Sequence, residues 1–298
     1  MIEGWLFFSL LASLLFFFFF LFDKYFVDKE VDDYVFGGSI YTLPLFLVML
    51  AIGFFKSGLV FDSLPVLTGV LAGGLYTVIL IFYLKGVSEE DVSRFVPVLS
   101  LNTVLIAVIS ALFLGENLGI PVYGGIFLTV AGAYFISLEN PISSLEQFQS
   151  SKAVLLAVGV AFIQALRDII IEVGSSQAPI WSLVFWMGMG GTILSTTILF
   201  TLKRNKIKQV KEHRDFILVG GMRSLGYLSF MVAISLGSVT LASATLKTNG
   251  MFVFLGATLL SLRNKMLHES KDRKIILQKF LASAMIVAGI VVMKLFSA

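Results

Sequence analysis

The chain has 298 residues, of which 57% are hydrophobic and 14% charged, and its mean hydropathy is +0.94. A water-soluble protein is nearer half apolar and a quarter charged, so the composition excludes an ordinary soluble enzyme and indicates a polytopic membrane protein. The net charge of +3 does not indicate nucleic-acid binding, because the basic residues lie between the apolar runs. The chain contains no cysteine, which excludes disulfides and thiolate metal sites. We expect no metal and no cofactor.

Apolar runs of spanning length, about 20 residues, recur ten times along the chain. They predict an all-α membrane protein with ten transmembrane helices. No basic segment precedes the first run and no small-residue cleavage site follows it, so we expect it to be a retained helix rather than a signal peptide. The expected spans are 4–22, 38–55, 65–84, 92–114, 119–138, 153–174, 179–202, 215–235, 238–261 and 276–296.

The fifth and tenth runs resemble each other. GIFLTVAGAYFI (125–136) aligns with ASAMIVAGIVVM (282–293), and the alignment pairs their two Val-Ala-Gly triplets. Five runs precede the polar linker 139–152 and five follow it. Because five crossings are an odd number, the second set must enter the membrane from the opposite side. The sequence therefore predicts two inverted five-helix repeats, residues 1–138 and 153–298.

Basic residues are unevenly distributed between the connections. The even-numbered connections and the two termini carry only Lys56 and Lys294. The odd-numbered connections carry Lys24, Lys29, Lys85, Arg94, Lys152, six basic residues from Lys203 to Arg214 and six from Arg263 to Lys279. The positive-inside rule predicts that the odd connections are cytoplasmic and that both termini lie outside.

Three basic residues, Arg167, Arg223 and Lys247, lie inside apolar runs, and Asp168 is the only comparably deep acid. A charge at the centre of a bilayer costs roughly 2.5–3.5 kcal/mol on insertion scales, so each needs a partner or a water-filled cavity. In one interpretation Asp168 pairs with Lys247 or Arg167 and locks helices together. In the other, the excess positive charge holds a substrate carboxylate or phosphate. We expect Lys247 to contact substrate, with Arg167 or Arg223 assisting.

Uncharged polar residues inside the runs extend this candidate site. We expect Tyr76, Asn102, Gln164, Thr248 and Asn249 to line it, although Tyr76 and Asn102 are equally suited to interhelical hydrogen bonds. Further candidates for the lining are Tyr41, Thr42, Thr77, Thr103, Trp181 and Trp186. Trp5 and Trp181 also lie near helix ends, where aromatic belts occur at the membrane interface.

The stretch YLKGVSEEDVSRFVPVLSLNTVLIAVISALFLGENLG, followed by GGIFLTVAGAYFI, resembles helices 3–5 of EamA-type members of the drug/metabolite transporter superfamily. The matching features are Val87-Ser88, Pro97, Gly115-Glu116 and Gly125 with Gly132. The second half of the chain departs from this pattern, because its ninth run lacks a proline and Leu267-His268-Glu269 replaces Leu-Gly-Glu. The resemblance implies ten helices around a central cavity, alternating access, and export or exchange of small metabolites. It also implies cytoplasmic termini, which is opposite to the basic-residue count.

We therefore expect a multi-pass plasma-membrane secondary transporter, an exporter or exchanger of small polar metabolites that carry a carboxylate or phosphate. Its partners would be a small-molecule substrate and the lipid bilayer, with the chain acting as a monomer. The segment 245–249 also resembles the ninth helix of the nucleotide-sugar and triose-phosphate branch, where a lysine meets phosphate, so exchange of nucleotide sugars or sugar phosphates is an alternative. An intramembrane prenyl or lipid-phosphate transferase is another, although the acids at 28–33 and 89–91 form no paired motif for Mg²⁺. We expect no enzyme activity.

Overall fold

The computed structural model describes residues 4–30, 33–56, 58–89, 98–137, 152–206, 213–252, 255 and 273–297. These residues form helices and contain no strand, which confirms the all-α prediction. The helices are α1 (Gly4–Glu30), α2 (Tyr34–Lys56), α3 (Ser63–Glu89), α5 (Leu101–Ile109), the π-helical turn η1 (Ser110–Leu114), α6 (Gly119–Ser137), α8 (Lys152–Ser175), α9 (Ile180–Thr201), α10 (Arg214–Leu236), α11 (Val239–Leu246) and α13 (Arg273–Phe296).

Within the described ranges, six helices are long and apolar enough to cross a membrane. They are the apolar parts of α2, α3, α6, α9, α10 and α13, and shorter apolar helices cover Gly4–Phe18 and Leu101–Leu114. Helix α8 is not among the six and carries four charged residues, Lys152, Arg167, Asp168 and Glu172. The chain is thus a helical membrane protein, and the count of ten spans stays a prediction.

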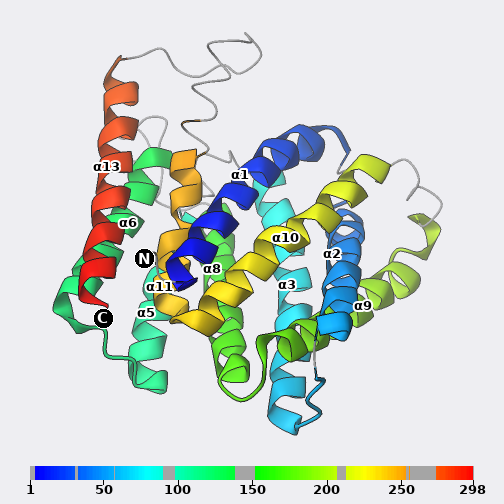
Figure 1. Ribbon diagram of the computed structural model, residues 1–298. Coiled ribbons are helices and arrows are strands. Elements are labelled where there is room, and N and C mark those ends of the chain that lie inside the picture. The colour runs from blue at the N-terminus through cyan, green and yellow to red at the C-terminus, as the bar shows by residue number, and fades with distance from the viewer. Residues whose placement is uncertain are drawn as a thin grey trace.

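Helices α6 and α13 pack side by side at one end of the molecule, while α2, α3 and α9 pack together at the other (Figure 1). Helices α1 and α10 run alongside each other between them. The contacts occur in pairs that interchange when the two halves of the chain are exchanged: α1 with α10 and α3 with α8, α1 with α11 and α5 with α8, α2 with α10 and α3 with α9. Such a pattern is expected of a repeated five-helix unit, and the two inverted repeats remain a prediction.

Two expected loops are helical. Helix α1 continues from the predicted end at residue 22 to Glu30, and α3 continues to Glu89. Val87-Ser88, one of the features that resemble the family pattern, therefore lies within α3. Charged residues of good helix propensity extend a helix beyond its apolar run, because the backbone hydrogen bonds continue outside the membrane region. Asp33 begins α2 instead, since its Oδ1 accepts hydrogen bonds from the Val35 and Phe36 N–H groups at 3.1 Å each.

Two expected spans are not continuous α-helices. The span predicted at 92–114 has a turn at Ser100 before α5 and ends in the π-helical η1, while its residues 92–97, including Pro97, lie outside the described part of the chain. The span predicted at 238–261 stops as α11 at Leu246, turns at Lys247 and is helical again over 248–252. At this turn the Lys247 N–H donates to the Ala244 carbonyl at 3.1 Å, three residues back, which tightens the backbone.

The connections gather on two faces. We call one the terminal face: the α1 N-terminus, residues 58–62, 115–118, 176–179 and 237–238. Here Trp5 packs on Gly237, and Val60 bonds with Ser182 and Trp186. We call the other the linker face: residues 33–34, 85, 203–206 and 213. It is held together by contacts of Asp33 with Lys203, of Phe36 with His213 and of Lys85 with Tyr34.

Glycines allow close backbone approach between helices that pack in lipid. A Cβ atom at Gly190 would overlap the carbonyl oxygen of Val70 in α3. In the same way, a Cβ atom at Gly125 of α6 would overlap the carbonyl oxygen of Gly289 in α13, and a Cβ atom at Gly289 would overlap that of Gly125. The residues that align between the fifth and tenth runs thus lie in two helices that pack on each other.

Gly190→Ala should lower the stability of the detergent-purified protein by about 1–3 kcal/mol, because the added methyl group overpacks the α3–α9 contact. Thermal unfolding measures this. Gly124→Ala is the matched control, since nothing lies within 4 Å of a Cβ atom there. Equal melting temperatures for the two variants would contradict the packing described here.

Asp33 also joins α2 to the start of the α9–α10 connection. Its Oδ2 accepts from Lys203 Nζ at 2.7 Å and lies 3.1 Å from Lys206 Nζ. Partial burial by itself favours the neutral acid, but the hydrogen bonds from Lys203, the Phe36 N–H and Lys206 outweigh it and lower the pKa of Asp33 from 3.8 to about 2. The carboxylate is therefore stabilised by folding.

Because the folded-state pKa lies below the unfolded one, the stability gained from the Asp33 charge should be present above about pH 4 and lost as the pH falls toward about 2. Asp33→Asn keeps an N-cap side chain and removes the charge. We expect the melting-temperature difference between parent and Asp33→Asn to be constant from neutral pH to about pH 5 and to shrink in more acid solution. Asp62→Asn, at an exposed acid, controls for net charge. A difference that does not vary with pH would contradict the ion pairs.

Candidate functional site

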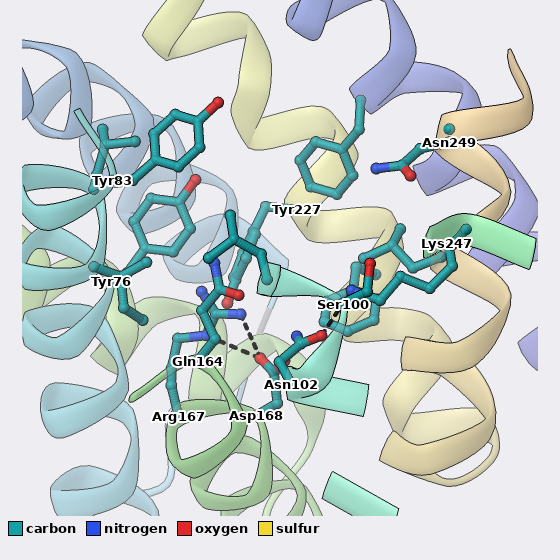
Figure 2. A pocket seen from close by; sticks show the side chains of 18 of the residues that line it. Tyr76, Tyr83, Ser100, Asn102, Gln164, Arg167, Asp168, Tyr227, Lys247 and Asn249 are labelled. Atoms are coloured by element: carbon teal, nitrogen blue, oxygen red, sulfur yellow. Dashed lines mark hydrogen bonds and ion pairs between the residues drawn. The ribbon is translucent and has the colours of Figure 1, made fainter. Parts of the chain in front are cut away.

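A cavity of about 190 Å³ lies between α1, α3, α5, α6, α8, α10 and the turn after α11 (Figure 2). Aromatic and aliphatic side chains form much of its wall, with polar groups pointing inward from several helices. The lining residues are Phe16, Tyr76, Ile79, Leu80, Tyr83, Leu99, Ser100, Asn102, Ala133, Ile136, Gln164, Arg167, Asp168, Arg223, Tyr227, Phe230, Leu246, Lys247, Asn249 and Gly250. An apolar pocket with a few convergent polar groups is the usual form of a small-molecule site.

Most of the predicted site residues lie at this wall, although they come from distant parts of the sequence. Thr248 is the exception, because it is buried and its hydroxyl donates to the Thr245 carbonyl at 2.9 Å. The residues at the wall are Tyr76, Asn102, Gln164, Arg167, Asp168, Arg223, Lys247 and Asn249. The structure places them together, and their role in substrate binding remains a prediction.

Arg167 and Asp168 form a buried ion pair with each other. Arg167 donates from Nε at 2.9 Å and from Nη2 at 2.6 Å, both to Oδ1 of Asp168. The guanidinium also lies over the rings of Tyr76, at 5.4 Å from the centroid, and Tyr227, at 5.2 Å. Cation–π contacts of this kind stabilise a desolvated guanidinium. Of the two partners expected for Asp168, Arg167 is the one that the geometry selects.

Lys247 bonds to a neutral group. Its Nζ donates to Oδ1 of Asn102 at 2.7 Å, and the same oxygen accepts from the Thr103 hydroxyl at 3.3 Å. Within the described residues no carboxylate lies within 4 Å of Lys247 Nζ, so Asp168 is near it without an ion pair. Figure 2 shows Lys247 and Asn102 reaching the cavity from different helices. The ammonium therefore faces the cavity with its charge uncompensated by a direct partner.

Arg223 approaches the cavity from α10. Its Nη1 donates to the Tyr41 hydroxyl at 3.1 Å, and the guanidinium lies 5.6 Å from the Phe16 ring centroid and 5.7 Å from that of Tyr41. Tyr41, expected at the cavity, instead holds Arg223 from behind. With Arg167 neutralised by Asp168, the wall has more positive than negative charge.

Other polar candidates join helices instead of lining the cavity. The hydroxyls of Thr42 and Thr77 both lie within hydrogen-bond distance of Ser195 in α9, at 2.9 and 3.2 Å. Thr103 bonds with Ser243 at 3.0 Å, and Trp186 Nε1 donates to the Val60 carbonyl at 2.8 Å. Trp181 is also absent from the lining. These side chains satisfy one another across helix contacts, as buried polar groups generally do.

The sequence analysis missed Ser100, Tyr83 and Tyr227. Tyr227 is 2% exposed, and its hydroxyl is buried without a hydrogen-bond partner among the described residues. It follows Arg223 by four positions, and residues at that spacing share one face of a helix. The same spacing could have identified Tyr227 from the sequence, once α10 was assigned and Arg223 placed at the cavity.

Residues 3–138 match the sequence model of the EamA-like transporter family. A solved structure, titled only as the crystal structure of a protein, superposes with a TM-score of 0.74 at 16% identity, over 99% of this chain and 99% of that one. At that identity the likeness concerns the fold alone. No curated protein matches the sequence.

Asp168→Asn should destabilise the protein, because it leaves Arg167 buried without its counter-charge, and breaking a buried pair costs roughly 3–5 kcal/mol. Adding Arg167→Gln should restore part of that stability, whereas adding Lys247→Gln should not. Thermal unfolding of the single and double variants in detergent measures both effects. Rescue by Lys247→Gln instead would show that Lys247 is the working partner of Asp168.

Proposed function

We propose that this protein, whose residues 3–138 match the EamA-like transporter family, is a secondary transporter of small polar metabolites that carry a carboxylate or phosphate. It would export or exchange them across the plasma membrane by alternating access, with the cavity as the substrate site. The family is one of transporters, which favours transport over an intramembrane transferase.

The observation that carries the proposal is the hydrogen bond from Lys247 to the neutral Asn102 at 2.7 Å, beside an Asp168 already bonded to Arg167. A lysine ammonium has three donors and attracts an anion strongly where the walls have low dielectric. A substrate carboxylate or phosphate would supply the missing counter-charge. In this role Asn102 orients Lys247, and Gln164, Asn249 and Arg223 contribute further donors at the wall.

The cavity size favours a small substrate. Pockets for drug-sized ligands occupy about 300–1,000 Å³, and the volume here is about 190 Å³. An intact nucleotide sugar exceeds this volume. Of the two alternative substrates, nucleotide sugars and sugar phosphates, the cavity volume therefore favours a sugar phosphate. The expected orientation, with the linker face in the cytoplasm, follows from the basic residues there, among them Lys203 and Lys206.

Lys247→Gln should abolish transport while the protein inserts and stays folded, because the variant keeps a polar side chain and loses the anion-attracting charge. A panel of amino acids, carboxylic acids and sugar phosphates is first screened by thermal stabilisation of the purified protein. The best stabiliser is then used in radiolabelled uptake by proteoliposomes, where we expect at least a tenfold loss in Lys247→Gln. Lys247→Arg should keep partial activity, since a planar guanidinium copies an ammonium poorly.

Lys56→Gln is the matched control, because Lys56 is exposed at the end of α2 and is not among the residues of the cavity wall. Parental uptake by Lys247→Gln would contradict the proposed site.

A further inference from the structure

The cavity lies toward the linker face. Its wall includes residues from the second half of α3 (Tyr76–Tyr83), from 99–102 at the start of α5, and Ala133 and Ile136 at the end of α6. These are the parts of the three helices that adjoin the linker face. On the other side of the cavity, toward the terminal face, the helices are closed by direct contacts.

Two glutamates make these closing contacts on the N-terminus of α11. Glu172, near the end of α8, accepts from the Val239 N–H at 3.1 Å through Oε2. Glu116, in the connection after η1, accepts from the Thr240 hydroxyl at 2.6 Å through its own Oε2. Carboxylates near a helix N-terminus are stabilised by its unpaired N–H groups and dipole. The contacts thereby join α8, the 115–118 connection and α11 at one point.

The closure lacks a cation. Within the described residues neither glutamate has an ion pair, and Oε1 of Glu116 is buried without a hydrogen-bond partner. A desolvated carboxylate oxygen without a partner is costly, and the two like charges at one helix end repel each other. The arrangement therefore closes the terminal face without making it rigid, which is what a contact that must open and re-form requires.

Helix α11 links this closure to the cavity. It has eight residues, Val239–Leu246, and is about 12 Å long at 1.5 Å per residue. Its first residues contact Glu172 and Glu116, and Ser243 in its middle bonds with Thr103. Its C-cap is Lys247, which bonds with Asn102 at the cavity. A displacement at one end of so short a helix moves the other end.

We propose that Glu116 and Glu172 form a latch that closes the terminal face, and that α11 acts as a rigid link that couples this latch to Lys247. The inference rests on the proposed transport function and concerns the regulation of the same site. One movement of α11 then accompanies both anion binding at Lys247 and release of the latch. Glu116 and Glu172 are positioning residues, since neither lines the cavity.

The chain has no cysteine, so single introduced thiols report access directly. Ser243→Cys lies in α11 between the latch and the cavity and is 1% exposed in the closed state. Ser100→Cys lines the cavity on the linker side. Each reporter is combined with Glu116→Ala and Glu172→Ala in the full chain, and labelling by a water-soluble maleimide is timed in detergent without any substrate. We expect at least fivefold faster labelling at Ser243→Cys and slower labelling at Ser100→Cys.

Opposite changes at the two reporters support the latch. Faster labelling at both would mean that the glutamates only stabilise the fold, and unchanged labelling would mean that they do not hold the terminal face, so either result overturns the proposal. If the double alanine variant unfolds, the single variants Glu116→Ala and Glu172→Ala decide by the same criterion, because each removes one of the two contacts with the N-terminus of α11 and leaves the other. Asp62→Asn, an exposed acid on the same face, should leave both rates unchanged. Since no substrate is used, failure here leaves the Lys247 transport test standing.

Discussion

The buried ion pair between Arg167 and Asp168 determines the electrostatics of the whole interior. It occupies Asp168, the only acid among the described residues of the cavity wall, with two hydrogen bonds from Arg167 to one carboxylate oxygen. The tyrosine rings of α3 and α10 cover the guanidinium, so the pair also ties α8 to both halves of the bundle. Charges in lipid must be compensated, and Asp168 is already paired with Arg167. Lys247 therefore bonds to a neutral amide, the side chain of Asn102.

Interrupted helices bring these groups to the cavity. The turn at Ser100 and the turn at Lys247 occur in α-helical runs from different halves of the chain, and both turns lie at the wall. Irregular backbone at membrane depth is tolerated where it lines a polar cavity, since its freed N–H and C=O groups can be satisfied there. The short α11 follows from the second turn, and its small size allows one element to contact both the terminal face and the cavity wall.

Tight helix contacts provide the rigid frame for this arrangement. Helices α2, α3 and α9 approach at glycines such as Gly73 and Gly190, and α6 and α13 approach at Gly125 and Gly289. In lipid, where apolar surface gains little from burial, such close packing supplies the association energy. Polar groups at these contacts bond between helices, as Ser195 does with Thr42 and Thr77.

The sequence by itself determined the membrane class, the all-α architecture and the kinship of 125–136 with 282–293, because hydropathy and small-residue spacing are local properties. It also identified Arg167, Asp168 and Lys247 as charges that need an explanation. Only the tertiary structure decided that Arg167 bonds to its own neighbour, although adjacent helical residues point about 100° apart, and that Lys247 is held by Asn102 from a helix 145 residues away. It also decided that Thr248 turns away from the cavity. Pairing among buried charges depends on the rotation of packed helices and on where their backbones break, and neither follows from the apolar pattern.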